Sequence, residues 1–385
     1  MQKQDWESAL RVDHKDKFEH WRKFRNIAAV NLLILGAGLL LVELLFGTWF
    51  SSTHALYQFT QSRNVALVRD NELPGEPRTI RYTRDHYGFR GLDGGVGAID
   101  VITVGGSTTD QRFLDDGATF QEVLKQRFAA DGRKLVIANA GIDGQSTIGH
   151  ISNFASWFEK ISGLHARFIL YYVGINDNLR MRETEMFDRV SHDDRWFRRL
   201  KDLVREKSVL YQICYVVRQL FVPPLFVHGI DHSLVAVDKA LVDKPLVSNY
   251  ATPSVKESLA GLQARIKELA SLTRKLGAEP IFVTQRSARW TVADGKVLGI
   301  DNYDIGEKHE FSDFERVNGV DIYNIEKLTS DAIMRACAEE NAVCVDLRAE
   351  IAFDLKRDFY DPVHTTGSGA KAVGDYLYAR LRNVL

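Results

Sequence analysis

The stretch Ile99-Asp-Val-Ile-Thr-Val-Gly-Gly-Ser-Thr-Thr-Asp110 decides the expected fold of this 385-residue chain. Its apolar run, Val101–Val104, ends abruptly in Gly105-Gly106, and Ser107 follows at once. A strand, a sharp glycine turn, a serine and then a helix hold a hydroxyl above the end of a parallel sheet, near a helix N-terminus. The stretch therefore predicts that Ser107 is a nucleophile, provided that other parts of the chain supply the groups that such a serine needs.

From residue 99 onward, apolar segments of strand length alternate with segments of helical periodicity. The expected strands cover 100–105, 135–138, 168–173, 280–284 and 342–347. The expected helices cover 119–130, 147–162, 254–276, 321–341 and 368–381. Two of these helices begin with a capping-box pattern, at Thr119–Glu122 and Ser254–Glu257. This alternation, with strands that are apolar almost throughout, predicts an α/β fold in which a parallel sheet carries helices on both faces.

Several polar or glycine residues follow the expected strands or lie in loops at strand ends. They are Ser107, Gly144, Asn176, Gln285 and His364. Ligands of parallel sheets bind beyond the carboxyl ends of the strands. We therefore expect these residues to meet on one face, although they come from distant parts of the chain.

A serine hydroxyl is a poor nucleophile at neutral pH unless a base takes its proton. Asp361 and His364 lie three residues apart in one loop, so they can supply an orienting carboxylate and a base. An anionic tetrahedral intermediate also needs hydrogen-bond donors, and the backbone N–H groups of Ser107 and Gly144 and the side-chain amide of Asn176 are the candidates. Each of these patterns is weak by itself, and it is their order along the chain that favours a catalytic interpretation.

This ordered set resembles the SGNH (GDSL-type) hydrolases, a family of esterases, lipases and carbohydrate acyl-modifying enzymes. The resemblance covers about 99–180 and 254–385, and the chain is similar to the membrane-anchored bacterial members. The four family blocks correspond to Val104–Ser107, Asn139–Gly144, Gly174–Asp177 and Asp361–His364. The resemblance implies a flavodoxin-like sheet, with the second strand outside the first, and the same catalytic and oxyanion roles as above.

The chain departs from the family pattern at three places. Gly106 stands where the Gly-Asp-Ser signature has Asp, and Thr365-Thr366 follows the histidine where Pro is common. A long insertion at 178–250, with expected helices at 187–207 and 209–221, has no counterpart in minimal members. The insertion is interpreted either as a lid or substrate wall over the end of the sheet, or as a peripheral helical cap.

Three further residues have two interpretations each. Gln285 and Arg286 end the fourth strand, where they can contact substrate or serve as a helix cap or a surface polar pair. Arg90, in the aromatic turn Tyr87–Gly91, can extend to the site or stabilise its own turn.

The N-terminal part of the chain has the pattern of a membrane anchor. A polar segment, 1–26, precedes the apolar stretch 27–50, which is interrupted only by Glu43. As a helix this stretch is long enough to cross a bilayer core of about 30 Å. Basic residues before it favour an N-terminus in the cytoplasm. A cleaved signal peptide is the main alternative, and residues 51–98 are expected to form a linker and an entry subdomain.

Composition excludes several functional classes. The formal net charge of −1 gives no sign of a surface for nucleic acid or acidic partners. Of three cysteines, Cys337 and Cys344 are expected to be small buried hydrophobic residues, and Cys214 completes no metal-ligand pattern. Six of the other histidines also lack metal-ligand spacing: His150, His165, His192, His228, His232 and His309. We expect no metal, nucleotide or flavin cofactor.

Three functions are consistent with these patterns. The first is a serine esterase of the cytoplasmic membrane that acts outside the cytoplasm, with an acyl-enzyme on Ser107 and an O-acetylated glycan as the expected substrate. The second is an O-acetyltransferase, in which a sugar hydroxyl replaces water as the acceptor. The third is an anchored assembly or binding protein without activity. The intact set of Ser107, Asn176, Asp361 and His364 argues against the third.

Overall fold

The computed structural model describes most of the chain. The described residues are 3–47, 49–50, 65–71, 73, 75–177, 188, 203–204, 207–211, 213–214, 217, 240–301, 314 and 316–385. The chain divides into two compact units. The smaller one consists of Met1–Leu56 and Asp193–Phe226, and the larger one of Tyr57–His192 and Val227–Leu385.

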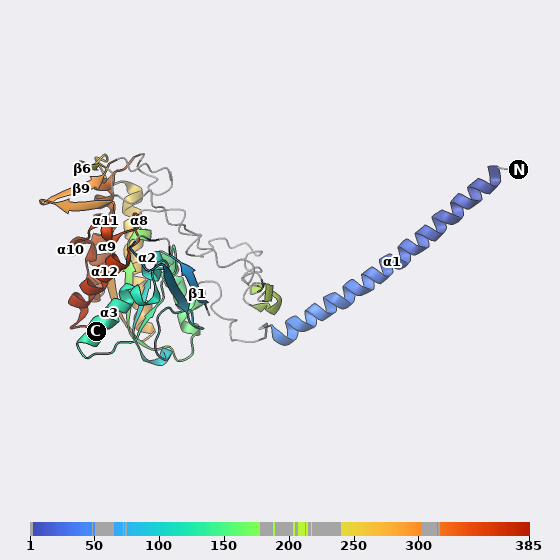
Figure 1. Cartoon of the computed structure of the whole chain (residues 1–385), viewed down its shortest axis with the longest axis horizontal. Helices are drawn as coiled ribbons and strands as arrows, with labels where there is room; N and C mark the ends of the chain where they lie inside the picture. The colour runs from blue at the N-terminus through green and yellow to red at the C-terminus, as the bar shows by residue number, and fades with distance from the viewer. Residues whose placement is uncertain are drawn as a thin grey trace. The chain divides into compact units, whose positions relative to one another are not determined.

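A five-stranded parallel sheet forms the centre of the larger unit (Figure 1). Its strands are β3 (Ile99–Gly105), β4 (Ile137–Asn139), β5 (Ala166–Val173), β7 (Glu279–Thr284) and β10 (Val343–Val345). Their spatial order is β10-β7-β5-β3-β4, so the second of these strands along the chain lies outside the first. The expected flavodoxin-like order is therefore confirmed. The strands are apolar on both faces because helices cover both.

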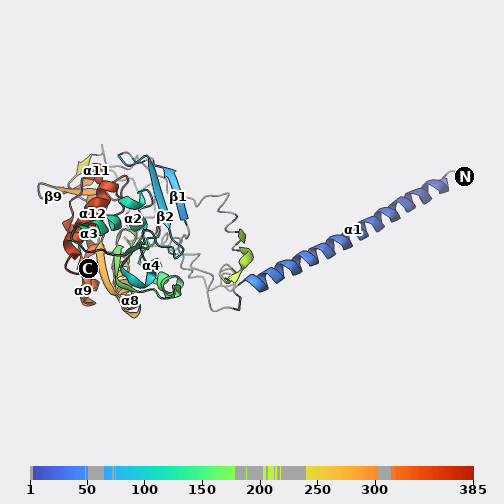
Figure 2. The same cartoon turned by 60° about the horizontal axis from the view of Figure 1, so that its bottom comes forward.

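Two hydrophobic clusters lie on opposite faces of this sheet. The five main helices are α3 (Phe120–Ala130), α4 (Thr147–Ser156), α8 (Pro253–Lys275), α9 (Gly319–Glu339) and α12 (Gly367–Leu381). Apolar residues of α4, α8 and α9 fill one cluster, and those of α3 and α12 fill the other. Both views show α3 beside α12 and α8 beside α9 (Figure 2). The larger unit is thus a three-layer α/β structure, as the sequence predicts.

Three helices differ from expectation at their ends, and α9 covers Gly319–Glu339 in place of the expected 321–341. Thr252, and not Ser254, caps α8, since its side chain accepts a hydrogen bond from the Val255 amide and Pro253 occupies the first helical position. The helix expected over 147–162 ends at Ser156. Trp157 leaves helical geometry, and its indole N–H donates to the Tyr87 carbonyl before a 3₁₀ turn follows.

Short antiparallel strands occur outside the strands expected from the sequence. In the expected linker, β1 (Val65–Asp70) pairs with β2 (Thr79–Arg84). In 287–320, between the fourth expected strand and the helix expected at 321–341, β8 (Trp290–Ala293) and β9 (Lys296–Ile300) form a hairpin, which β6 (Leu241–Val242) extends. Asp294 and Gly295 at its tip both have positive φ, as a tight two-residue hairpin turn requires.

Cys337 and Cys344 form a disulfide, which corrects the expectation that they are separate buried thiols. The bond joins the last turn of α9 to β10, elements that are adjacent because β10 follows α9 directly into the sheet. Cys214 remains as a free, exposed cysteine.

Helix α1 (Lys3–Phe46) dominates the smaller unit. Within its portion Trp21–Phe46, an 18-residue window has a mean hydropathy of 2.3, and the portion is long and apolar enough to cross a membrane. The described residues of 203–217 belong to this same unit, and Asp188 belongs to the larger one. Most of the two helices expected at 187–207 and 209–221 lies outside the described residues.

Candidate active site

The candidate nucleophile lies at the tip of β3, where the short helix α2 (Ser107–Asp110) begins. Gly105 is needed at this turn, since a Cβ there would lie 2.1 Å from Thr109 Oγ1 and 2.7 Å from the Tyr172 carbonyl oxygen. The turn from β3 into α2 is therefore packed so closely against Thr109 and the Tyr172 backbone that a side chain at position 105 would not fit. Ser107 is the first helical residue, and its side chain is half-buried at the carboxyl edge of the sheet.

Ser107, His364 and Asp361 form a continuous hydrogen-bonded chain. His364 Nε2 lies 2.7 Å from Ser107 Oγ, and His364 Nδ1 lies 2.5 Å from Asp361 Oδ2. When Nδ1 carries the proton and donates it to the carboxylate, Nε2 is free to accept the serine proton. The His364 and Asp361 side chains are 18% and 15% exposed, so the base is accessible to a substrate.

The loop that carries this histidine is closed by its own carboxylate. Asp361 Oδ1 accepts hydrogen bonds from the backbone amides of Val363, at 2.8 Å, and His364, at 2.7 Å. The Tyr360 ring stacks on the imidazole at a centroid distance of 5.6 Å. Asp361 therefore holds both the backbone of this loop and the imidazole, and the Tyr360 ring holds one face of the imidazole.

Burial and charge act in opposite directions on this pair. Burial by itself disfavours the imidazolium, but the negative charge of Asp361 and the hydrogen bond to it raise the pKa of His364 above its usual value. Burial would likewise raise the pKa of Asp361, but the charge and hydrogen bond of His364 and two backbone amides lower it below its usual value. The pair is thus arranged to hold an imidazolium against a carboxylate.

The candidate oxyanion donors approach the serine from two other loops. Gly144 has a φ of +74°, a conformation that favours glycine, and Gln145 follows it. Asn176 lies in a 3₁₀ turn after β5, and its side-chain nitrogen donates to the Gln145 carbonyl at 2.9 Å. A Cβ at Gly106 would lie 2.2 Å from Asn176 Nδ2 and 3.1 Å from that same carbonyl. The nucleophile turn, the glycine loop and the asparagine therefore converge.

Gln285 and Arg286 are buried, and both bond to other parts of the protein. Gln285 Nε2 donates to Thr108 Oγ1 at 2.6 Å, and its Oε1 accepts from the Ile175 amide at 2.8 Å. It therefore connects the nucleophile turn to the segment that carries Asn176, a role that the sequence does not reveal.

Arg286 points into the protein interior. It donates to the carbonyls of Ile351 and Trp290, and its guanidinium lies 3.9 Å from the centre of the Trp290 ring. Burial lowers the pKa of Arg286 to about 10. Arg286 is therefore a buried residue and not part of a surface polar pair with Gln285.

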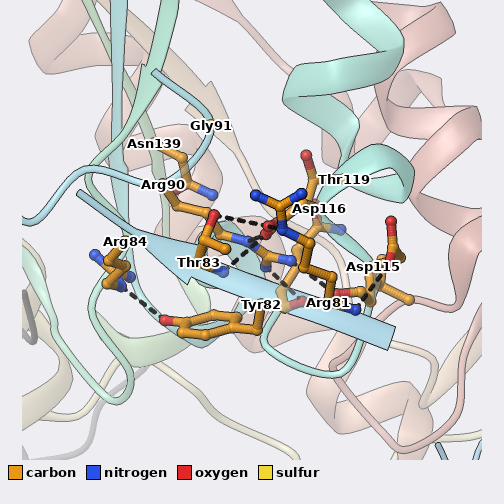
Figure 3. Close-up of polar contacts among 12 residues, drawn as sticks. Arg81, Tyr82, Thr83, Arg84, Arg90, Gly91, Asp115, Asp116, Thr119 and Asn139 are labelled. Carbon is orange, nitrogen blue, oxygen red and sulfur yellow. Dashed lines mark hydrogen bonds and ion pairs between the residues drawn. The ribbon is translucent and has the colours of Figure 1, made fainter. Parts of the chain in front are cut away.

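A buried polar network supports the segment after the nucleophile (Figure 3). Arg84 donates to the Tyr82 hydroxyl and to Asp110, and the Tyr82 hydroxyl donates to Asp110 as well. Arg90 is 1% exposed and donates to the backbone carbonyls of Asp110, Gln111 and Leu114 and to Asp116. Arg90 thus stabilises the turn after α2.

One charged pair beside the histidine is not evident from the sequence. Arg112 and Asp143 form an ion pair of 2.6 Å, with side chains 14% and 13% exposed. The charges of both act on His364: Asp143 raises its pKa and Arg112 lowers it. The two residues are distant in sequence, and Asp143 precedes Gly144 directly, so the pair flanks the base and the glycine loop.

The described residues contain no group of three or more His, Cys, Asp or Glu side chains placed to hold a metal ion. His192, His228, His232 and His309 lie outside those residues. Within them, His150 is fully buried, and burial lowers its pKa to about 3, so its ring is neutral at physiological pH.

Comparison with known proteins gives structural similarity only. No family model and no curated protein sequence matches the chain. Among solved structures, TesA is 13% identical with a TM-score of 0.41, over 74% of this chain and 99% of TesA. A variant of the acetyl xylan esterase Axe2 from Geobacillus stearothermophilus is 12% identical with a TM-score of 0.38, over 74% and 96%. A member of the lipolytic protein G-D-S-L family from Veillonella parvula is 14% identical with a TM-score of 0.39, over 75% and 100%.

Proposed function

We propose that this protein is a serine esterase that acts through an acyl-enzyme on Ser107. The observation that carries the proposal is the hydrogen-bonded chain from Ser107 Oγ through His364 to Asp361. A neutral His364 accepts the serine proton as Oγ attacks the ester carbonyl carbon, and the carbonyl π electrons move onto oxygen. The resulting oxyanion is bound by the N–H groups of Ser107 and Gly144 and by the Asn176 amide.

The remaining steps release first the alcohol and then the acid, and they use the same residues. His364 gives its proton to the leaving alkoxide, the C–O bond breaks, and the acyl group stays on Ser107. His364 then takes a proton from water as the water oxygen attacks the acyl carbon. The bond from that carbon to Ser107 Oγ breaks, His364 gives its proton to Oγ, and the acid leaves. Asp361 stays ionised throughout and stabilises the imidazolium, in keeping with its lowered pKa.

We propose that the active site faces the exterior of the cytoplasmic membrane. The span Trp21–Phe46 supports an anchor, and the basic residues Arg22, Lys23 and Arg25 before the most apolar part favour a cytoplasmic N-terminus. The disulfide Cys337–Cys344 is a second, independent support, because such bonds persist in oxidising compartments. An O-acetyl group on a glycan is the substrate class that fits this location.

The test uses the full-length protein in detergent or nanodiscs. We expect it to release acetate from p-nitrophenyl acetate and to be labelled by a fluorophosphonate, and we expect Ser107→Ala to abolish both. Labelling that persists in this variant would refute the mechanism. Absence of labelling in the wild-type protein would favour a non-catalytic anchored protein.

An O-acetyltransferase would use the same acyl-enzyme, with a sugar hydroxyl as acceptor. Mass spectrometry of an oligosaccharide incubated with the enzyme and an acetyl donor separates the two activities. Free acetate with an unmodified oligosaccharide indicates hydrolysis, and an acetylated oligosaccharide indicates transfer.

A further inference from the structure

Glu43 is the only charged residue between Ile27 and Phe50, and it has specific partners. Its carboxylate accepts hydrogen bonds from the Ser208 hydroxyl and from the amides of Val209, at 3.0 Å, and Leu210, at 3.4 Å. The Trp49 indole N–H donates to it as well, at 3.2 Å. An ionisable residue in a membrane helix is expected to have such partners.

Glu43 acts as an N-terminal cap for a helix to which it does not itself belong. Helical backbone is interrupted at Ser208 and resumes at 209, so the amides that bond to Glu43 are those left without partners at a helix start. A carboxylate at this position is favoured by hydrogen bonding and by the helix dipole. Glu43 therefore fastens a part of the insertion to the last turns of α1, across 165 residues of sequence.

The fastened segment exposes large apolar side chains. Leu203, Ile213 and Val217 are 44%, 50% and 45% exposed, and the last two are one helical turn apart, on one face. In the same unit, Leu45 and Phe46 at the end of α1 are 66% and 69% exposed. The end of α1 and the segment that Glu43 holds therefore both expose large apolar side chains.

The depth at which this segment lies in the membrane follows from the position of Glu43 along α1. Glu43 lies three residues before the end of α1, which is about 4.5 Å along the helix axis. Trp49, which bonds to the same carboxylate, is a residue type enriched at membrane–water boundaries. A segment held at this level meets the boundary between acyl chains and headgroups, where exposed apolar side chains are favourable.

We propose that the described residues of 203–217 form a second membrane-contacting element, which Glu43 seats at the outer lipid–water boundary beside the anchor helix and whose exposed apolar side chains touch lipid. The proposal rests on the proposed anchor and does not depend on the proposed esterase activity. It gives this part of the insertion an attachment role in place of the lid role considered from the sequence.

Cys214 allows the proposal to be tested in the full chain. It is exposed and free, and the other two cysteines form the disulfide, so a maleimide–NBD label attaches within the segment. In nanodiscs we expect this label to be quenched by lipids that carry a doxyl group near the headgroup end of the acyl chain and to be protected from iodide. The control label is Ala293→Cys in a Cys214→Ala background, at an exposed hairpin position of the larger unit. Its iodide quenching should exceed that of Cys214 by at least about threefold, the contrast expected between water and the acyl boundary.

Two variants probe the attachment and the lipid contact separately. Glu43→Leu keeps α1 apolar but removes the acceptor, and Ile213→Asp with Val217→Asp places charge on the exposed face. Both should raise iodide quenching of the Cys214 label and lower lipid quenching, and Ser107→Ala should leave both unchanged.

Equal iodide quenching at Cys214 and at the control position would overturn the proposal. Energy transfer between Cys214 labels that grows with protein density, without lipid quenching, would also overturn it and assign the face to a second copy of the chain. Lipid quenching in a protein that lacks esterase activity would refute only the proposed function.

Discussion

Replacing Gly106 by Ala tests whether a glycine is needed here to leave space for the side-chain amide of Asn176, the candidate oxyanion donor. The new Cβ would lie 2.2 Å from Asn176 Nδ2. Non-bonded contact begins near 3.4 Å, so the amide must retreat by about 1.2 Å. That movement takes Nδ2 away from Gly106 and hence from the adjacent Ser107 N–H, with which it would share the oxyanion. A hydrogen bond of about 2.9 Å then becomes a separation of about 4 Å, which is no longer a hydrogen bond.

The expected effect is a loss of catalysis without a loss of folding. Removing one oxyanion donor costs about 10²–10³ in kcat, or about 3–4 kcal/mol of transition-state stabilisation. The backbone at Gly106 has a φ of −84°, which alanine adopts freely, and the displaced atom ends a movable side chain. The free energy of unfolding should therefore change by no more than about 1 kcal/mol.

The assay is p-nitrophenyl acetate hydrolysis with thermal unfolding measured on the same preparations. Gly95→Ala is the matched control, since its backbone is extended and a Cβ there meets nothing within 4 Å. Asn176→Ala should lose as much activity as Gly106→Ala, and the double variant should lose no more than either alone. Losses that multiply in the double variant, or a Gly106→Ala enzyme with wild-type kcat, would refute the reasoning.

Three further predictions concern the base, the bridging glutamine and the disulfide. His364 must be neutral to accept a proton and its pKa is raised, so kcat/KM should rise with pH through a midpoint above the usual histidine value of about 6.5. Asp361→Asn should move that midpoint to lower pH and reduce kcat by about 10⁴, and an unmoved midpoint in the pH–rate profile would contradict the assignment. Gln285→Leu should lower kcat by leaving the Ile175 amide unpaired, whereas Gln285→Glu keeps that acceptor and should retain more activity; equal steady-state rates would exclude the bridging role. Replacing Cys337 and Cys344 by Ala should lower the free energy of unfolding by about 2–3 kcal/mol in the chain-entropy treatment of so short a loop, and denaturant titrations that coincide with wild type would count against the bond.

The sheet could be predicted because each of its strands is marked by a pattern of residues that are consecutive in the sequence. A strand buried on both faces must be apolar almost throughout, as β3 and β5 are. The glycine turn between β3 and the following helix can also be recognised from consecutive residues of the sequence. The Asp361–His364 spacing is also local, because the carboxylate bonds to the backbone of its own loop.

Other features depend on residues that only the fold brings together. Gln285 bonds to Thr108 across 177 positions, and no periodicity or spacing marks that pairing. The β8–β9 hairpin was missed because its strands are short and partly polar, although Asp294-Gly295 is a recognised turn signal. The disulfide was missed because seven positions of separation do not tell whether a helix end and the next strand bring two sulfurs together.

The division of the chain has a consequence for how this protein could be shed from a membrane. The backbone passes between the two units three times, at 56–57, 192–193 and 226–227. A single proteolytic cut before residue 57 removes only one of these connections. The larger unit would stay attached through 193–226 for as long as Ser208 and Val209 keep their bonds to Glu43. Release as a soluble fragment would then need a second event, the separation of that segment from α1, and its rate would report the strength of a contact between two pieces of one chain.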